Sequence, residues 1–358
     1  MARGTFASIG GVKRISVVVL AIVISVGACV FAFPAAGNAA SVHRWHLSSK
    51  TYKDDLVAVS RNADFTCYLT ALSTSTGNAT PSIQGPGGPG TISATYAASD
   101  LTGLIDTQGQ LSYLANHHNP VTSSDLDQAR TNLIGALNQT LQGSSCPTTS
   151  GLAVLDSLPP SFVDLLVTQQ AVQTAVNTLA IREASKPGLA FAFYRFQPSL
   201  WDTVCFNLVY SQSPQAVSAA QQAIGGGQSI GQAVSASQGV VSSTPSPECV
   251  GPNTSLFSAS YGVQRNTVGL PIGQPSQIVS AGGTYAFYIV TKRTPNTFAA
   301  SRAAIINYLA GQASRVIDAK SGTYLSQDDV VVNSQFGRWQ APTRTVAGQV
   351  DPPLAPTH

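Results

Sequence analysis

The sequence changes character at Trp201, and this change limits the folds that the chain can adopt. Before it, apolar residues recur at helical spacing, most clearly over Ser93–His117. After it, Val204–Tyr210 and Tyr285–Thr291 are rich in aromatic and β-branched residues, as strands are. Helical spacing then returns over Phe298–Ile317. The pattern predicts an α+β fold, in which both ends of the chain build a mainly helical module and a small α/β domain is inserted between them.

Capping residues and breakers indicate where the first helices begin and end. Pro120 ends the helix over Ser93–His117, and Thr122 or Ser123 caps the next one. The glycines and prolines of residues 85–90 cannot continue a helix or strand, so they predict a loop. Residues 41–200 are therefore expected to form the helical module.

The rest of the chain divides into three further segments. A strand, a helix, a short helix, a loop and a second strand follow one another and predict an α/β domain over residues 201–295. Residues 296–322 are expected to form a C-terminal helix that packs on the helical module. The proline-rich end, residues 323–358, is expected to be an irregular tail.

The amino terminus, residues 1–40, has the features of an export segment. Basic residues precede an apolar run over Ile15–Phe33, and small residues follow it. Ser25–Cys29 fits a bacterial lipobox, in which Cys29 would be acylated. Two alternatives stay open: cleavage after Ala39, or retention of the apolar run as a membrane span. All three place the folded part outside the cytoplasm, either bound to the membrane or secreted.

The four remaining cysteines form an even set, as expected in an oxidising compartment. We favour Cys67 with Cys146 and Cys205 with Cys249, because each pair then stays within one predicted module. Unpaired buried thiols are the alternative. No CxxC motif is present, so neither redox catalysis nor a structural zinc site is expected.

Several classes of function find no support in the residues. Charged residues make up only 10% of the chain and form no Lys/Arg run, so no nucleic-acid partner is expected. His43 and His46, with His117 and His118, have no cysteine or paired carboxylate at a recognised metal spacing. No histidine lies between residues 119 and 357, so the central region offers no imidazole for a Ser-His-Asp triad. We therefore expect no metal, no cofactor and no serine-hydrolase triad.

Short motifs in a fixed order carry a family resemblance. They are Val42–Ser48 followed by Asp55-Leu56, then Leu114–Leu126, then Asn333–Trp339 with Val350–Pro353. In this order they resemble the extracytoplasmic foldases of the SurA/PrsA type, in particular the actinobacterial proteins with a SurA-like amino-terminal domain. The resemblance implies a SurA-like helical chaperone domain and a domain like the parvulin-type peptidyl-prolyl isomerases, or rotamases.

The parvulin-like part runs from Cys205 to Arg293. Ile224–Ile230 is similar to the family's Leu-x-x-Gly-x-x-Phe motif, and Val268–Val279 is similar to the segment before its last strand. Active parvulins carry a histidine in the first strand and another in the last strand. The resemblance places the second at Tyr288 and the first at Leu208, or at Phe206 if the register slips by two residues. The sequence has no histidine between His118 and His358.

The resemblance also implies where a substrate would bind. Phe206 or Leu208, with Phe257 and Tyr288, would form an apolar cup for a proline ring, and Asn207 and Tyr288 are the polar candidates for catalysis. We expect a chaperone that binds unfolded exported polypeptides, with a non-catalytic parvulin domain. One alternative is an active isomerase with a histidine-free site, and a second is an envelope adaptor that binds one specific partner.

Overall fold

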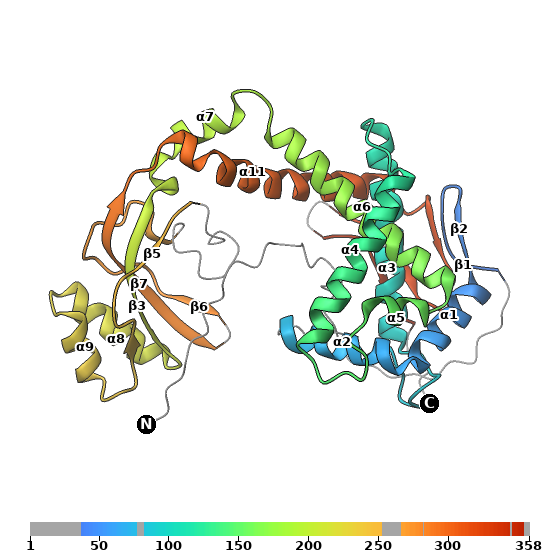
Figure 1. The fold of residues 1–358 in the computed structure, drawn as a ribbon, viewed down its shortest axis with the longest axis horizontal. Helices are drawn as coiled ribbons and strands as arrows, with labels where there is room; N and C mark the ends of the chain where they lie inside the picture. Colours follow the sequence, from blue (N-terminus) through green and yellow to red (C-terminus); the bar gives the residue numbers. More distant parts are fainter. Residues whose placement is uncertain (1–36, 77–81, 253–265, 282, 344–345, 354–358) are drawn as a thin grey trace. The chain divides into compact units, whose positions relative to one another are not determined.

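The computed structural model describes residues 37–76, 82–252, 266–281, 283–343 and 346–353. Helices predominate in these residues and the strands pair antiparallel, which confirms the α+β class (Figure 1). The chain divides into two compact units. We call Met1–Leu179 with Ser314–His358 the helical unit, and Ala180–Ala313 the sheet unit. Residues from both ends of the chain thus fold together, and the sheet unit is an insertion between them.

The helical unit begins with a β-hairpin. β1 (Asn38–Val42) pairs with β2 (Trp45–Ser48), and on its other side with β8 (Val330–Val332). Ala39 and Ala40 are fully buried. The fold therefore starts before residue 41, and cleavage after Ala39 would cut through β1. The apolar run and Cys29 lie outside the described residues.

Within the described residues of the helical unit, α1 to α5 follow, and several of them begin at a capping side chain. They are α1 (Ser49–Arg61), α2 (Ala63–Thr76), α3 (Ala94–Asn116), α4 (Ser123–Gln142) and α5 (Gly151–Asp156). Thr122 caps α4 in a capping box with Asp125, as its sequence predicts. The pattern did not predict α2. Only Asn62 separates it from α1, and the Asn62 side chain accepts a hydrogen bond from the Phe65 backbone N–H.

Both boundaries between the units fall inside a helix. α6 (Pro160–Ala184) and α11 (Phe298–Ser321) each contribute residues to both units. In the helical unit, α1, α3 and α6 share one apolar core around Leu56, Leu101 and Phe162. A disulfide joins Cys67 in α2 to Cys146 after α4, and a second joins Cys205 to Cys249 in the sheet unit. These are the pairs that the sequence favours.

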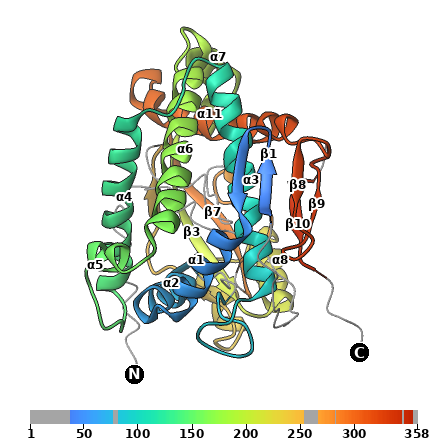
Figure 2. The same cartoon turned by 90° about the vertical axis from the view of Figure 1, so that its right-hand side faces the viewer.

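The carboxyl end is not the irregular tail that its prolines suggest. β9 (Arg338–Gln340) pairs with β10 (Gln349–Asp351), next to β8 (Figure 2). Trp339 on β9 is buried in the core of the helical unit, and the Val350 backbone N–H donates to Thr102 Oγ1 on α3 at 2.8 Å. Strands of three residues show too little alternation for the sequence to predict them.

Two long strands form the centre of the sheet unit. β3 (Thr203–Ser211) and β7 (Thr284–Thr294) are antiparallel neighbours in the order β4-β3-β7-β6, and β5 also pairs with β3. β4 (Ser242–Ser243) and β5 (Glu248–Val250) lie in a segment predicted to be a loop, and β6 is Val279–Ala281. α8 (Pro214–Gly225) and α9 (Ile230–Ala236) cover one face of this sheet, over Val209, Phe287 and Ile289.

A small helical cluster completes the sheet unit. It consists of α7 (Leu189–Phe196), the 3₁₀ turn η1 (Pro198–Trp201) and the first half of α11. Trp201 is fully buried among Phe193, Tyr308 and Ile305. Residues 180–200 therefore fold with the sheet, although their helical pattern suggests the other module.

Candidate functional site

The two positions at which the resemblance places histidines lie side by side. Leu208 in β3 and Tyr288 in β7 are direct cross-strand partners. Residues that face each other across an antiparallel pair have Cβ atoms about 5 Å apart, so their side chains share one small area of the sheet. Leu208 is partly buried, and Tyr288 is only 2% exposed.

Phe206 joins Tyr288 in an apolar cluster on the face opposite α8 and α9. The Phe206 ring centroid lies 5.3 Å from that of Tyr288, edge to face at 86°. Val204, Val250 and Val290 complete the buried cluster, and Leu208, Leu270 and Val279 border it. We call this set the β3–β7 cluster. Tyr288 is thus packed against Phe206 and almost inaccessible to solvent.

The segment before β6 holds the Tyr288 backbone in place. The Ser276 N–H donates to the Tyr288 carbonyl at 2.8 Å, and Ser276 Oγ accepts from the Tyr288 N–H at 2.9 Å. Three residues earlier in the chain, the Gly273 N–H donates to the Val290 carbonyl at 2.8 Å. Residues 273–276 thus run along β7 and satisfy its backbone groups next to the β3–β7 cluster.

Asn207 does not belong to this cluster. Successive strand residues point to opposite faces, so Asn207 points away from the side that Phe206 and Leu208 share. Its Nδ2 donates to the Thr244 carbonyl at 3.4 Å, while Thr244 Oγ1 accepts from the Leu208 N–H at 3.0 Å. Asn207 therefore positions the segment after β4. Phe257, the remaining predicted contact, lies outside the described residues.

A hollow opens at the carboxyl end of β3. It has a volume of about 570 Å³, and we call it the β3-end hollow. It is lined by Tyr210, Ser211, Gln212, Ser213, Val240, Ser242 and Thr284. Ser211 Oγ donates to the Val240 carbonyl at 2.6 Å and accepts from the Ser213 N–H, which fixes the turn into α8. No Lys, Arg, Asp or Glu lines the hollow. In the sequence it is an ordinary polar turn, so no motif reveals it.

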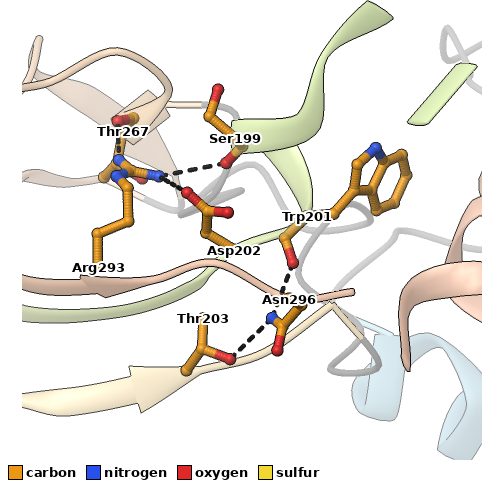
Figure 3. A network of polar contacts seen from close by, with 7 residues as sticks. All are labelled: Ser199, Trp201, Asp202, Thr203, Thr267, Arg293 and Asn296. Atoms are coloured by element: carbon orange, nitrogen blue, oxygen red, sulfur yellow. Dashed lines mark hydrogen bonds and ion pairs between the residues drawn. The ribbon is translucent and has the colours of Figure 1, made fainter. Parts of the chain in front are cut away.

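A polar network joins the helical cluster of the sheet unit to its strands (Figure 3). Arg293 at the end of β7 donates to the carbonyls of Ser199 and Thr267 and lies 3.6 Å from an Asp202 carboxylate oxygen. Asn296 Nδ2 donates to the Trp201 carbonyl at 2.9 Å and to Thr203 Oγ1 at 3.0 Å. Burial raises the pKa of Asp202, and the neighbouring Arg293 opposes that shift. The network is structural, because it ties η1 to both strands.

The histidines that the sequence singled out lie in separate places. His43 is 3.5 Å from Asp329, and the His117 ring stacks on Tyr113 with centroids 3.9 Å apart. Among the described residues, no group of His, Cys, Asp and Glu is arranged to hold a metal ion. In the same residues, no helix combines the length and apolar character needed to cross a membrane.

Comparison with known proteins gives distant structural similarity alone. No protein family and no curated protein matches the chain. Among solved structures, the foldase PrsA of Streptococcus pneumoniae aligns with 67% of this chain and 87% of its own, at 10% identity and a TM-score of 0.32. PrsA of Bacillus cereus aligns with 71% of this chain and 94% of its own, at 12% identity and a TM-score of 0.32. A structure from a study of two SurA-like chaperones of Campylobacter jejuni aligns with 83% of this chain and 100% of its own, at 12% identity and a TM-score of 0.29. At these values the matches carry no argument about function.

Proposed function

We propose that the protein is an extracytoplasmic, foldase-like chaperone that holds unfolded exported polypeptides, and that its parvulin-like domain does not catalyse isomerisation. The proposal includes attachment to the membrane through a lipid on Cys29 or through the apolar run. Two disulfides support a place outside the cytoplasm, because such bonds persist in oxidising compartments. The observation that carries the holding function is the β3-end hollow.

The chemistry of the β3-end hollow suits weak contacts with many chains. Its volume falls within the range of ordinary ligand sites. Hydroxyl and amide groups can bond the backbone of an extended segment, while Tyr210 and the half-exposed Val240 offer apolar contact. Since no charged side chain lines it, the hollow selects no charged sequence. Neutral, partly apolar segments of unfolded chains fit this description.

The β3–β7 cluster supports the absence of catalysis. Rotation about a prolyl bond must be accelerated by binding the twisted peptide more tightly than either planar form. Leu208 offers no hydrogen bond, and Tyr288 is buried against Phe206. The two positions therefore pack the sheet, and nothing at Leu208 can replace an imidazole.

Aggregation of a chemically unfolded client, followed by light scattering, tests the holding function. We expect the wild-type protein to slow aggregation at stoichiometric amounts, and Tyr210→Ala with Val240→Ser to lose most of this effect. Val331→Ser is the matched control, because Val331 is 63% exposed on β8, in the helical unit. The proposal fails if wild-type protein slows the aggregation of no client, or if the hollow variant protects as well as the control.

A further inference from the structure

Charge is divided unevenly between the two units. The sequence of the sheet unit has seven Lys and Arg residues and three Asp and Glu residues. In the helical unit, leaving out residues 1–36, there are nine basic and thirteen acidic residues. The sheet unit is therefore basic, while the remainder of the folded chain is acidic.

Among the described residues of the sheet unit, two acidic residues are paired with basic ones. Glu183 pairs with Lys186, and Asp202 pairs with Arg293. Arg195 on α7 and Arg302 on α11 are exposed and form no ion pair within the described residues. Their charges face solvent and are available to an anionic partner.

Large apolar side chains are exposed on α7, and the partly buried Phe298 at the start of α11 lies beside them. On α7, Phe196 is 79% exposed, Phe191 47% and Leu189 43%. The Phe191 ring lies 5.2 Å, centroid to centroid, from that of Phe298, the first residue of α11. Beneath them, Phe193 stacks on Tyr308 at 5.5 Å, so the two helices are packed on each other. An exposed group of large apolar side chains on a rigid base commonly marks an interaction surface.

The helical spacing puts the arginines beside the phenylalanines. Arg195 follows Phe191 by four residues, and Arg302 follows Phe298 by four, so each pair shares one side of its helix. We call the set Leu189, Phe191, Arg195, Phe196, Phe298 and Arg302 the α7–α11 surface. Aromatic and basic side chains together are typical of helices that lie in the interface of a bilayer.

We propose that the α7–α11 surface docks onto an anionic lipid bilayer, with the phenylalanines in the headgroup region and Arg195 and Arg302 against lipid phosphates. A soluble polyanion would need the arginines and would gain nothing from a phenylalanine that is four-fifths exposed, so the pairing favours lipid. This contact goes beyond the proposed function. It is also made by residues other than 1–36, so it does not require an amino-terminal anchor.

Amide hydrogen exchange on the full chain tests the proposal. The protein is reconstituted into vesicles of phosphatidylcholine, with or without added phosphatidylglycerol, so that any amino-terminal anchor is present in both samples. We expect peptides covering Leu189–Phe196 to exchange several-fold more slowly on vesicles with phosphatidylglycerol. Phe196→Ser and the double change Arg195→Gln with Arg302→Gln should each remove this protection. Val331→Ser, in the helical unit, should keep it.

Other results would overturn the proposal. Unchanged exchange of α7 on the anionic vesicles would do so, as would equal protection on both kinds of vesicle, since charge would then play no part. Equal protection by a soluble polyanion without vesicles would assign the surface to a polymer instead. Both sets of variants alter exposed side chains, and unchanged exchange in the core strands β3 and β7 will verify that they fold.

Discussion

Asp100, on α3 of the helical unit, is a buried carboxyl that accepts a hydrogen bond from a tyrosine. Tyr52 Oη donates to Asp100 Oδ2 and to the Ala97 carbonyl, both at 2.9 Å. Burial raises the Asp100 pKa from 3.8 to about 6, although the hydrogen bond from Tyr52 opposes the shift. Two turns later, burial and the Asp318 carboxylate raise the pKa of Asp106 to about 7. Both carboxyls therefore keep their protons to a higher pH in the folded protein than in the unfolded chain.

The stability of the helical unit should therefore fall as the pH rises from about 4 to about 7. A carboxyl whose pKa is higher in the folded state takes up a proton on folding, so its contribution is complete below the unfolded pKa and is lost as the pH passes the folded one. For Asp100, the shift of about two pKa units corresponds to up to about 3 kcal/mol. We expect Asp100→Asn, which keeps an acceptor for Tyr52, to flatten this dependence. Urea unfolding at several pH values will measure it.

Asp164→Asn is the control for that prediction, because Asp164 is exposed on α6. It should leave the slope of unfolding free energy against pH unchanged. An Asp100→Asn variant with the wild-type slope would show that this carboxyl is not responsible for the pH dependence.

At the residue scale, the sequence predicts candidate positions, but it does not predict how their side chains pack. The resemblance selects Leu208 and Tyr288, and the strand pairing brings them together. Strand alternation places Asn207 and Phe206 on opposite faces, so this separation could be predicted from the sequence. The edge-to-face packing of Phe206 on Tyr288 could not be predicted, because it depends on the strand register and on the course of residues 273–276.

At the scale of elements, the Arg293 network connects η1 to the strands β3 and β7. Arg293→Gln would leave Asp202, a buried carboxylate, without its cation. Breaking one partner of a buried pair costs about 3 to 5 kcal/mol. Because Arg293 keeps some solvent exposure, we expect the lower end of that range. Faster amide exchange in β3 and β7 would report the loss.

Arg302→Gln provides the comparison for Arg293→Gln. Arg302 has the same charge, is exposed, and forms no ion pair within the described part of the chain. Its replacement should change exchange in the sheet by little. Similar amide exchange of β3 and β7 in both variants would mean that the buried Arg293–Asp202 pair does not stabilise the connection between η1 and these strands.

Long helices and long strands were predictable, and short elements were not. The helix predicted over Ser93–His117 corresponds to α3, and the strand predicted over Val204–Tyr210 lies within β3. Both could be predicted because each segment shows several repeats of its period. β4 has two residues and β5 three, too few for alternation to show. Their positions follow from pairing with β3, which is a tertiary effect.

At the scale of the whole molecule, two units share one continuous chain. Each disulfide closes within one unit, Cys67 to Cys146 in the helical unit and Cys205 to Cys249 in the sheet unit. The change of pattern at Trp201 predicted an insertion, but the boundaries lie inside α6 and α11. Helical periodicity continues across such a boundary, so the sequence cannot mark it.

The central claim is that the sheet unit binds unfolded chains without isomerising them. The most direct measurement is the refolding of a client whose slow phase is limited by a prolyl bond, with both its rate and its final yield recorded. We predict that the protein raises the yield, that the rate of the slow phase does not change, and that Tyr288→Phe and Leu208→Ala alter neither rate nor yield. A faster slow phase that these two variants weaken would contradict the account and show a histidine-free isomerase.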